Sequence, residues 1–96
     1  AAVAFAEAQR LLRKKADAQA ATFAVSVGLE RIKDNDTAGA IERFREAVRL
    51  SPDYPEAHYQ LALALQATGG RAEAHAEFAK AHRLAPHLTP PEARKP

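Results

Sequence analysis

The chain has 96 residues, and its balance of 47% hydrophobic and 27% charged residues predicts one small folded domain rather than a disordered segment. It has no cysteine, which excludes a disulfide framework, a thiolate zinc site and a cysteine nucleophile. The formal net charge of +2 is too small to indicate nucleic-acid binding without a reading motif, and no apolar run is long enough for membrane insertion. Abundant alanine favours closely packed helices over a β-sandwich.

The first predicted element is one long helix from near Ala1 to near Lys33. Residues 14–20 are strong helix formers, and residues 12–23 contain no Gly, Pro or Asn that could form a turn. At 1.5 Å per residue the helix should be about 50 Å long. An apolar line at helical spacing runs along it, consisting of Phe5, Ala8, Leu12, Ala16, Ala20, Phe23 and Val27.

Two further segments share one pattern at an offset of 34 residues. Residues 40–52 and residues 74–86 both read Ala-x-x-x-Phe-x-x-Ala-x-x-Leu-x-Pro. The Ala, Phe, Ala and Leu positions fall on one stripe of a helix, where the small alanines allow a neighbouring helix to approach closely. Phe44 and Phe78 should fill the space between paired helices, and the final proline should end each helix.

A helix should precede each of these stripes, because Val27-Gly28 aligns with Leu61-Ala62 at the same offset. The predicted links between paired helices contain Asn35 and Gly69, which suit the left-handed conformation that ends a helix. Asp36 is a suitable N-cap for the helix that follows the first link.

The period and the doubled pattern resemble the tetratricopeptide repeat over two full units, residues 21–54 and 55–88. The chain departs from the family pattern at His58, where the family often has Trp, and at Arg31 and Leu65, where it often has Tyr. The resemblance implies an all-α fold, a superhelix of helix hairpins preceded by the long N-terminal helix.

The segments outside the two units are predicted as follows. Residues 1–20 carry a partial third stripe and are interpreted as the remnant of an earlier repeat, continuous with the next helix. Residues 89–96 are proline-rich and are expected to be extended or disordered. The last helix, residues 72–84, then has no capping helix after it, as such arrays usually have.

In this family, first-helix residues line a concave groove that binds proteins or peptides. The resemblance assigns eight residues to this groove: Val25, Leu29, Ile32, Lys33, Tyr59, Gln60, Leu63 and Gln66. Leu29 and Leu63 stand where a peptide-clamp member of the family has Asn, so we expect no carboxylate clamp. Either an apolar peptide or helix binds here, or another part of the protein or a second copy covers the stripe.

Self-association is predicted from the ends of the array. A repeat buries an apolar face against its neighbour, and here both ends of the array lack a neighbour. If the first helix is straight, Phe5, Ala8 and Leu12 are carried away from the body of their own chain. A second copy could cover them, so we predict a homodimer or a larger homo-oligomer with Phe5, Leu12 and Phe23 at or near the contact.

No catalytic constellation is recognisable. The sequence has no paired nucleophile and base, no phosphate-binding glycine loop and no set of metal ligands at a known spacing, so we predict a non-enzyme with no cofactor and no metal. His58 and His82 could approach each other across one helix pair and form a two-histidine metal site. Partly buried histidines with a structural role are the simpler interpretation. Asn35-Asp36-Thr37 fits the pattern of an N-glycosylation site, but the turn between helices explains these residues without glycosylation.

The leading hypothesis is therefore a non-catalytic protein–protein interaction module. The alternatives are a structural self-assembly element and a regulatory appendage of a larger enzyme. The sequence assigns no compartment.

Overall fold

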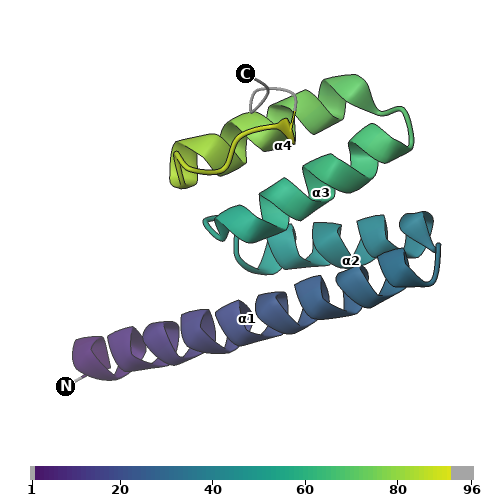
Figure 1. Cartoon of the computed structure of the whole chain (residues 1–96). Coiled ribbons are helices and arrows are strands. Elements are labelled where there is room, and N and C mark those ends of the chain that lie inside the picture. Colours follow the sequence, from purple (N-terminus) through teal and green to yellow (C-terminus); the bar gives the residue numbers. More distant parts are fainter. Residues whose placement is uncertain (1, 92–96) are drawn as a thin grey trace.

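The computed structural model describes the backbone of residues 2–91 and the side chains of residues 4–91, a part of the chain that contains four α-helices. Helix α1 (Ala2–Lys33) pairs with α2 (Thr37–Leu50), and α3 (Pro55–Ala67) pairs with α4 (Arg71–Leu84). Because α2 also packs on α3, the two hairpins stack (Figure 1). The all-α prediction is confirmed.

Helix α1 is continuous, as its uninterrupted run of helix-forming residues predicts. Its C-terminal half packs on α2, and its N-terminal half projects past the stacked hairpins as an arm (Figure 1). The arm makes the molecule elongated, with extents of 55 × 30 × 19 Å. Ala1, the first residue of the predicted partial stripe, lies outside the described residues.

The turns between paired helices form as the sequence predicts. Asn35 ends α1 with a φ of 61°, and Asp36 caps α2 by accepting a hydrogen bond of 2.9 Å from the Gly39 amide. Gly69 plays the part of Asn35 in the second hairpin, with a φ of 91°. The Gly70 amide then donates to the Leu65 carbonyl oxygen at 2.8 Å. Both hairpins are thus closed by one residue in the left-handed conformation.

The core of the first hairpin is built around Phe44, which is 1% exposed. Its ring lies directly over Gly28 of α1: a Cβ atom at that glycine would come within 2.7 Å of the ring's Cδ1 atom. The missing side chain at Gly28 is therefore what lets α1 and α2 approach around the ring. Phe78 takes the equivalent place in the second hairpin and is 5% exposed, which confirms the prediction for both phenylalanines.

The turn after α4 repeats the turn after α2 at the 34-residue period. The Leu88 amide donates to the Ala85 carbonyl oxygen at 2.9 Å, just as the Tyr54 amide donates to the Ser51 carbonyl oxygen at 3.1 Å. Leu88 and Tyr54 both pack against the core, Leu88 as a buried residue and Tyr54 as a partly buried one. The chain thus leaves its second repeat unit by the same corner that joins the first unit to the second.

No further α-helix follows α4 in the described residues, but the corner after α4 covers part of it. Leu88 is buried, the Tyr59 hydroxyl donates to the Thr89 carbonyl oxygen at 3.0 Å, and His82 Nδ1 lies 3.2 Å from the Leu88 carbonyl oxygen. These contacts hold the start of the tail, at Leu88 and Thr89, against α3 and α4. The rest of the predicted tail, residues 92–96, lies outside the described residues.

Candidate functional site

The eight predicted groove residues do not form one open surface. Val25 and Tyr59 are buried, at 6% and 8% exposed, so neither offers an accessible contact. Leu29 and Ile32 of α1 are 38% and 39% exposed, which is high for side chains of their size. Lys33 is exposed and pairs with Glu30 of its own helix. The other three residues are half-buried on α3: Gln60, Leu63 and Gln66.

Tyr59 is buried because its surroundings on α3 are filled from two sides. Its ring makes an edge-on contact with Phe78, at 5.5 Å between ring centres, and its hydroxyl is held by Thr89. The position of Tyr59 in the repeat places it among the groove residues. The sequence does not show that Thr89 of the tail covers it. The apolar groove side chains that stay accessible are Leu29 and Ile32 on α1 and, in part, Leu63 on α3, and these three are called here the α1–α3 strip.

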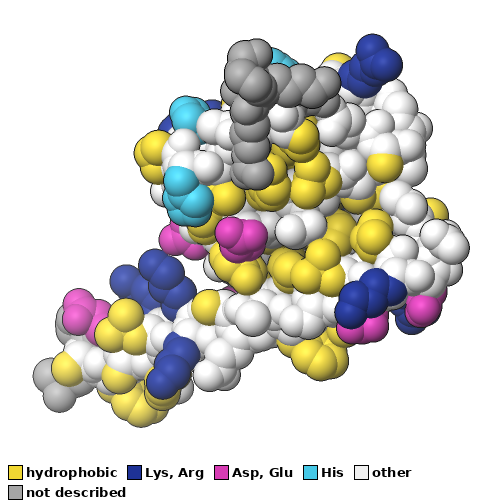
Figure 2. All heavy atoms as spheres, in the orientation of Figure 1, with side chains coloured by type: hydrophobic (Ala, Val, Ile, Leu, Met, Phe, Trp, Pro, Cys, Tyr) yellow, Lys and Arg dark blue, Asp and Glu magenta, His cyan; other side chains and the backbone are white. Residues whose placement is uncertain are grey.

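A second apolar surface runs along α1, on the side turned away from the stacked hairpins. Phe5, Leu12 and Phe23, the residues predicted for self-association, are 66%, 68% and 70% exposed. Figure 2 shows two separate groups of hydrophobic side chains on this lower side of the long helix, one near its N-terminal end and one beneath the hairpins. Large apolar side chains left this open in a small chain usually mark an interaction surface. Whether a second copy covers them stays a prediction.

Phe23 also borders a shallow groove between α1 and α2. The groove has a volume of about 270 Å³ and is lined by side chains of both helices, namely Ala20, Phe23, Ala24, Val27, Arg43, Glu46 and Leu50. Its walls are mainly apolar, with one basic and one acidic side chain at the α2 edge. It is therefore suited to an apolar side chain supplied by a partner.

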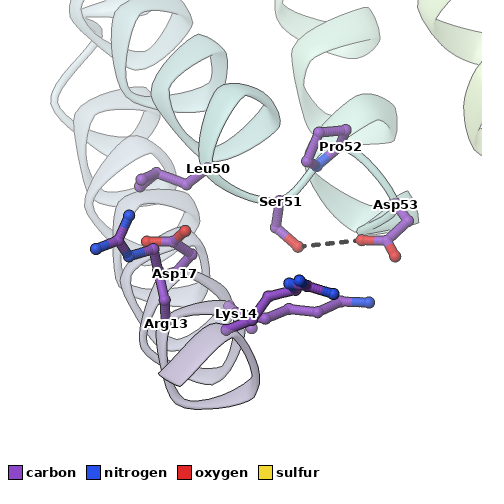
Figure 3. Close-up of a pocket in the computed structure, with 9 residues that line it drawn as sticks. Arg13, Lys14, Asp17, Leu50, Ser51, Pro52 and Asp53 are labelled. Carbon is purple, nitrogen blue, oxygen red and sulfur yellow. Dashed lines mark hydrogen bonds between the residues drawn. The ribbon is translucent and has the colours of Figure 1, made fainter. Parts of the chain in front are cut away.

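A third surface is a cleft of about 570 Å³ between the α1 arm and the corner that follows α2 (Figure 3). Arg10, Arg13 and Lys14 line it from the arm, and none of the three forms an ion pair with another described residue. Asp17 and Asp53 line the same cleft and offset much of the positive charge. The three basic side chains thus border a cleft, but the mixed charge does not single out an anionic ligand.

The histidine considered for a metal site has another role. His58 is 3% exposed, and its Nδ1 lies 2.7 Å from Glu77 Oε1 while its Nε2 lies 2.6 Å from the Pro52 carbonyl oxygen. Lys80 Nζ lies 3.3 Å from the other oxygen of Glu77. With both ring nitrogens engaged, His58 ties α3 to α4 and to the preceding corner. Among the described residues, no group of three or more His, Cys, Asp or Glu side chains is placed to hold a metal ion.

A surface ion pair links α2 to α4 across the stacked hairpins. Arg45 faces Glu73 with both guanidinium Nη atoms, one of them 3.2 Å from a carboxylate oxygen. This hydrogen-bonded pairing holds the pKa of Glu73 below its usual range and raises the pKa of Arg45. Both groups are about half exposed, so the pair orients the helices more than it stabilises them.

The fold identifies the structural class of the chain. Two stacked helix hairpins with a small-residue stripe, a phenylalanine between paired helices and a fixed 34-residue period make the chain an all-α helical-repeat protein. No described helix is both long enough and apolar enough to cross a membrane.

Comparison with known proteins matches part of the chain to a family. Residues 28–69, from the end of α1 through α2 and α3, match the family model described as TPR repeat. The resemblance to the tetratricopeptide repeat found in the sequence is therefore confirmed over this segment. The match indicates a protein–protein interaction module. A search among curated proteins found no match.

Proposed function

We propose that this chain is a non-catalytic interaction module whose α1–α3 strip binds an apolar peptide or helix of a protein partner. The observation that carries the proposal is the exposure of Leu29 and Ile32 on α1 and the partial exposure of Leu63 on α3, the first helices of two stacked tetratricopeptide hairpins. An amphipathic helix or an extended segment with apolar anchors matches such a strip. The remaining groove residues, Lys33, Gln60 and Gln66, would border the strip with polar groups.

The strip can be tested with a peptide library displayed on phage. Peptides selected on the chain should share apolar anchors, and Leu29→Glu together with Leu63→Glu should weaken their binding at least tenfold, because two charges would enter an apolar contact. Leu84→Glu, on the exposed side of α4, is the matched control and should bind as the unchanged chain does. Circular dichroism must show that all variants keep their helices. Selected peptides that bind the double variant equally well would place the site elsewhere.

A second proposed property is self-association through the exposed side of α1. It is supported by the 66–70% exposure of Phe5, Leu12 and Phe23. Light scattering at micromolar concentration should give a mass above 10.4 kDa, and Leu12→Glu with Phe23→Glu should return it to 10.4 kDa. A mass of 10.4 kDa for the unchanged chain at all concentrations would refute this property.

A further inference from the structure

The exposed side of α1 has the spacing of a coiled-coil seam. Six positions along α1 follow one another at intervals of four, three, four, three and four residues: Phe5, Gln9, Leu12, Ala16, Gln19 and Phe23. This is the alternation that keeps one side of a helix facing a partner helix. All six are exposed and none is charged. The buried residues of α1, from Ala21 to Gly28, lie roughly on the opposite side of the helix.

The seam is also symmetric about the level of Lys14. Phe5 and Phe23 stand at equal distances from this level, as do Gln9 and Gln19. Two antiparallel copies paired about this level bring Phe5 of one copy to Phe23 of the other, and Gln9 to Gln19, so that side chains of the same kind face each other. The two remaining positions in the middle, leucine and alanine, would place a large side chain opposite a small one, which allows close packing.

We propose that the partner of this surface is a second copy of the chain, with the two α1 helices antiparallel around a two-fold axis at the level of Lys14. The inference rests on the proposed self-association and specifies its geometry. Phe5 of each copy would lie against Phe23 of the other, a contact about 27 Å from its symmetry equivalent.

The groove between α1 and α2 favours the antiparallel arrangement over the parallel one. Phe23 borders that groove, together with Ala20 and Val27. In the antiparallel pair the partner's Phe5 arrives at this groove, so its ring is covered by both α1 and α2. In a parallel pair Phe5 would meet only its own copy at the free end of the arm, and the groove would stay open.

The charges beside the seam predict how the pairing depends on salt. Arg13 and Lys15 flank the middle of the seam on opposite sides, and neither forms an ion pair with another described residue. In the antiparallel pair each lies near its equivalent on the partner, so four cations gather around the axis. Salt screens such repulsion over about 10 Å at 0.1 M, so the dimer should tighten as ionic strength rises.

The geometry can be tested with single cysteines, since the chain has none of its own. Gln9→Cys and Gln19→Cys are purified separately and then mixed in a glutathione redox buffer. Antiparallel pairing brings position 9 of one copy level with position 19 of the other, within reach of a disulfide. Two copies of position 9 would instead be about 15 Å apart along the axis. The mixture should therefore form a disulfide dimer that neither variant forms alone. Lys14→Cys, on the cleft side of the same helix, is the control and should not react.

Each outcome is decisive. Disulfides within each single variant would show parallel pairing and overturn the inference. A dimer by light scattering without any disulfide would move the interface away from the seam, and would leave self-association standing. A monomer at all concentrations and salt levels would refute self-association and this geometry together. Circular dichroism on each variant establishes that the helices are intact.

Discussion

Removing the ring of Phe44 should be among the most destabilising single changes in this chain. The side chain is 1% exposed and fills the space between α1 and α2. A buried phenylalanine removes about 150–250 Å² from water, and Phe→Ala substitutions in cores cost about 3–5 kcal/mol. A domain of this size has only about 5–14 kcal/mol of stability in total. Phe44→Ala should therefore lose a large share of its folded stability.

The contact between Phe44 and Gly28 allows a second test, which probes the close approach of α1 and α2 and not only the burial of Phe44. In the unchanged chain, Gly28→Ala would place a Cβ atom 2.7 Å from the Cδ1 and 2.9 Å from the Cζ of Phe44. Such overpacking costs about 1–3 kcal/mol, partly offset by about 1 kcal/mol of better helix propensity for alanine. Once Phe44 is alanine, the clash is gone and only the propensity gain remains. Gly28→Ala should therefore change from destabilising to stabilising.

Urea unfolding followed by circular dichroism at 222 nm measures all four members of this double-mutant cycle. Protein concentration is kept fixed, because self-association would add to the apparent stability. Sucrose can raise the stability of the weakest variant into the measurable range. The coupling between the two sites should be about 1–3 kcal/mol. An equal loss from Gly28→Ala in both backgrounds would show that the close approach of α1 and α2 does not depend on that ring.

Three further predictions concern the contacts that fix the second hairpin. Glu73→Gln should destabilise at neutral pH, because Arg45 holds the pKa of Glu73 below its usual range. That stability is present above the usual glutamate pKa and is lost as pH falls through the lowered one, so the difference in urea midpoint should disappear in acid. Glu77→Ala should cost about 1–3 kcal/mol by leaving a buried ring nitrogen of His58 unpaired, and Glu77→Gln should cost less, since an amide can still pair with it. Leu88→Ala should cost about 2–5 kcal/mol in the same assay if the corner after α4 is part of the core, and a loss below about 1 kcal/mol would contradict that.

Local chemistry explains which parts of the fold were predictable from sequence. The residues that end and begin helices, Asn35, Asp36 and Gly69, act through their own backbone or through a neighbour three positions away. The burial of Phe44 and Phe78 follows from a stripe that repeats at 34 residues. Such features depend on near neighbours and on one period, so a single sequence is enough to find them.

The candidate site was harder to predict because it depends on distant segments. Tyr59 belongs to the groove by its place in the repeat, yet contacts from Phe78 and Thr89 close it. The pairing of His58 with Glu77 joins residues 19 apart, and its geometry is fixed only once α3 and α4 have packed. The division of the chain at residues 20, 54 and 88 stays a prediction, since the family match covers residues 28–69 alone.

The covered corner after α4 bears on the size of any assembly. A head-to-tail stack joins two different faces and can grow without limit, whereas a two-fold contact uses one face twice and closes after two copies. In the described chain, Leu88 and Thr89 already cover the α3–α4 end, while the seam from Phe5 to Phe23 is open at the other. If the open side of α1 pairs with its own equivalent, as proposed above, the contact closes after two copies. The proposed geometry therefore predicts a dimer rather than a growing stack.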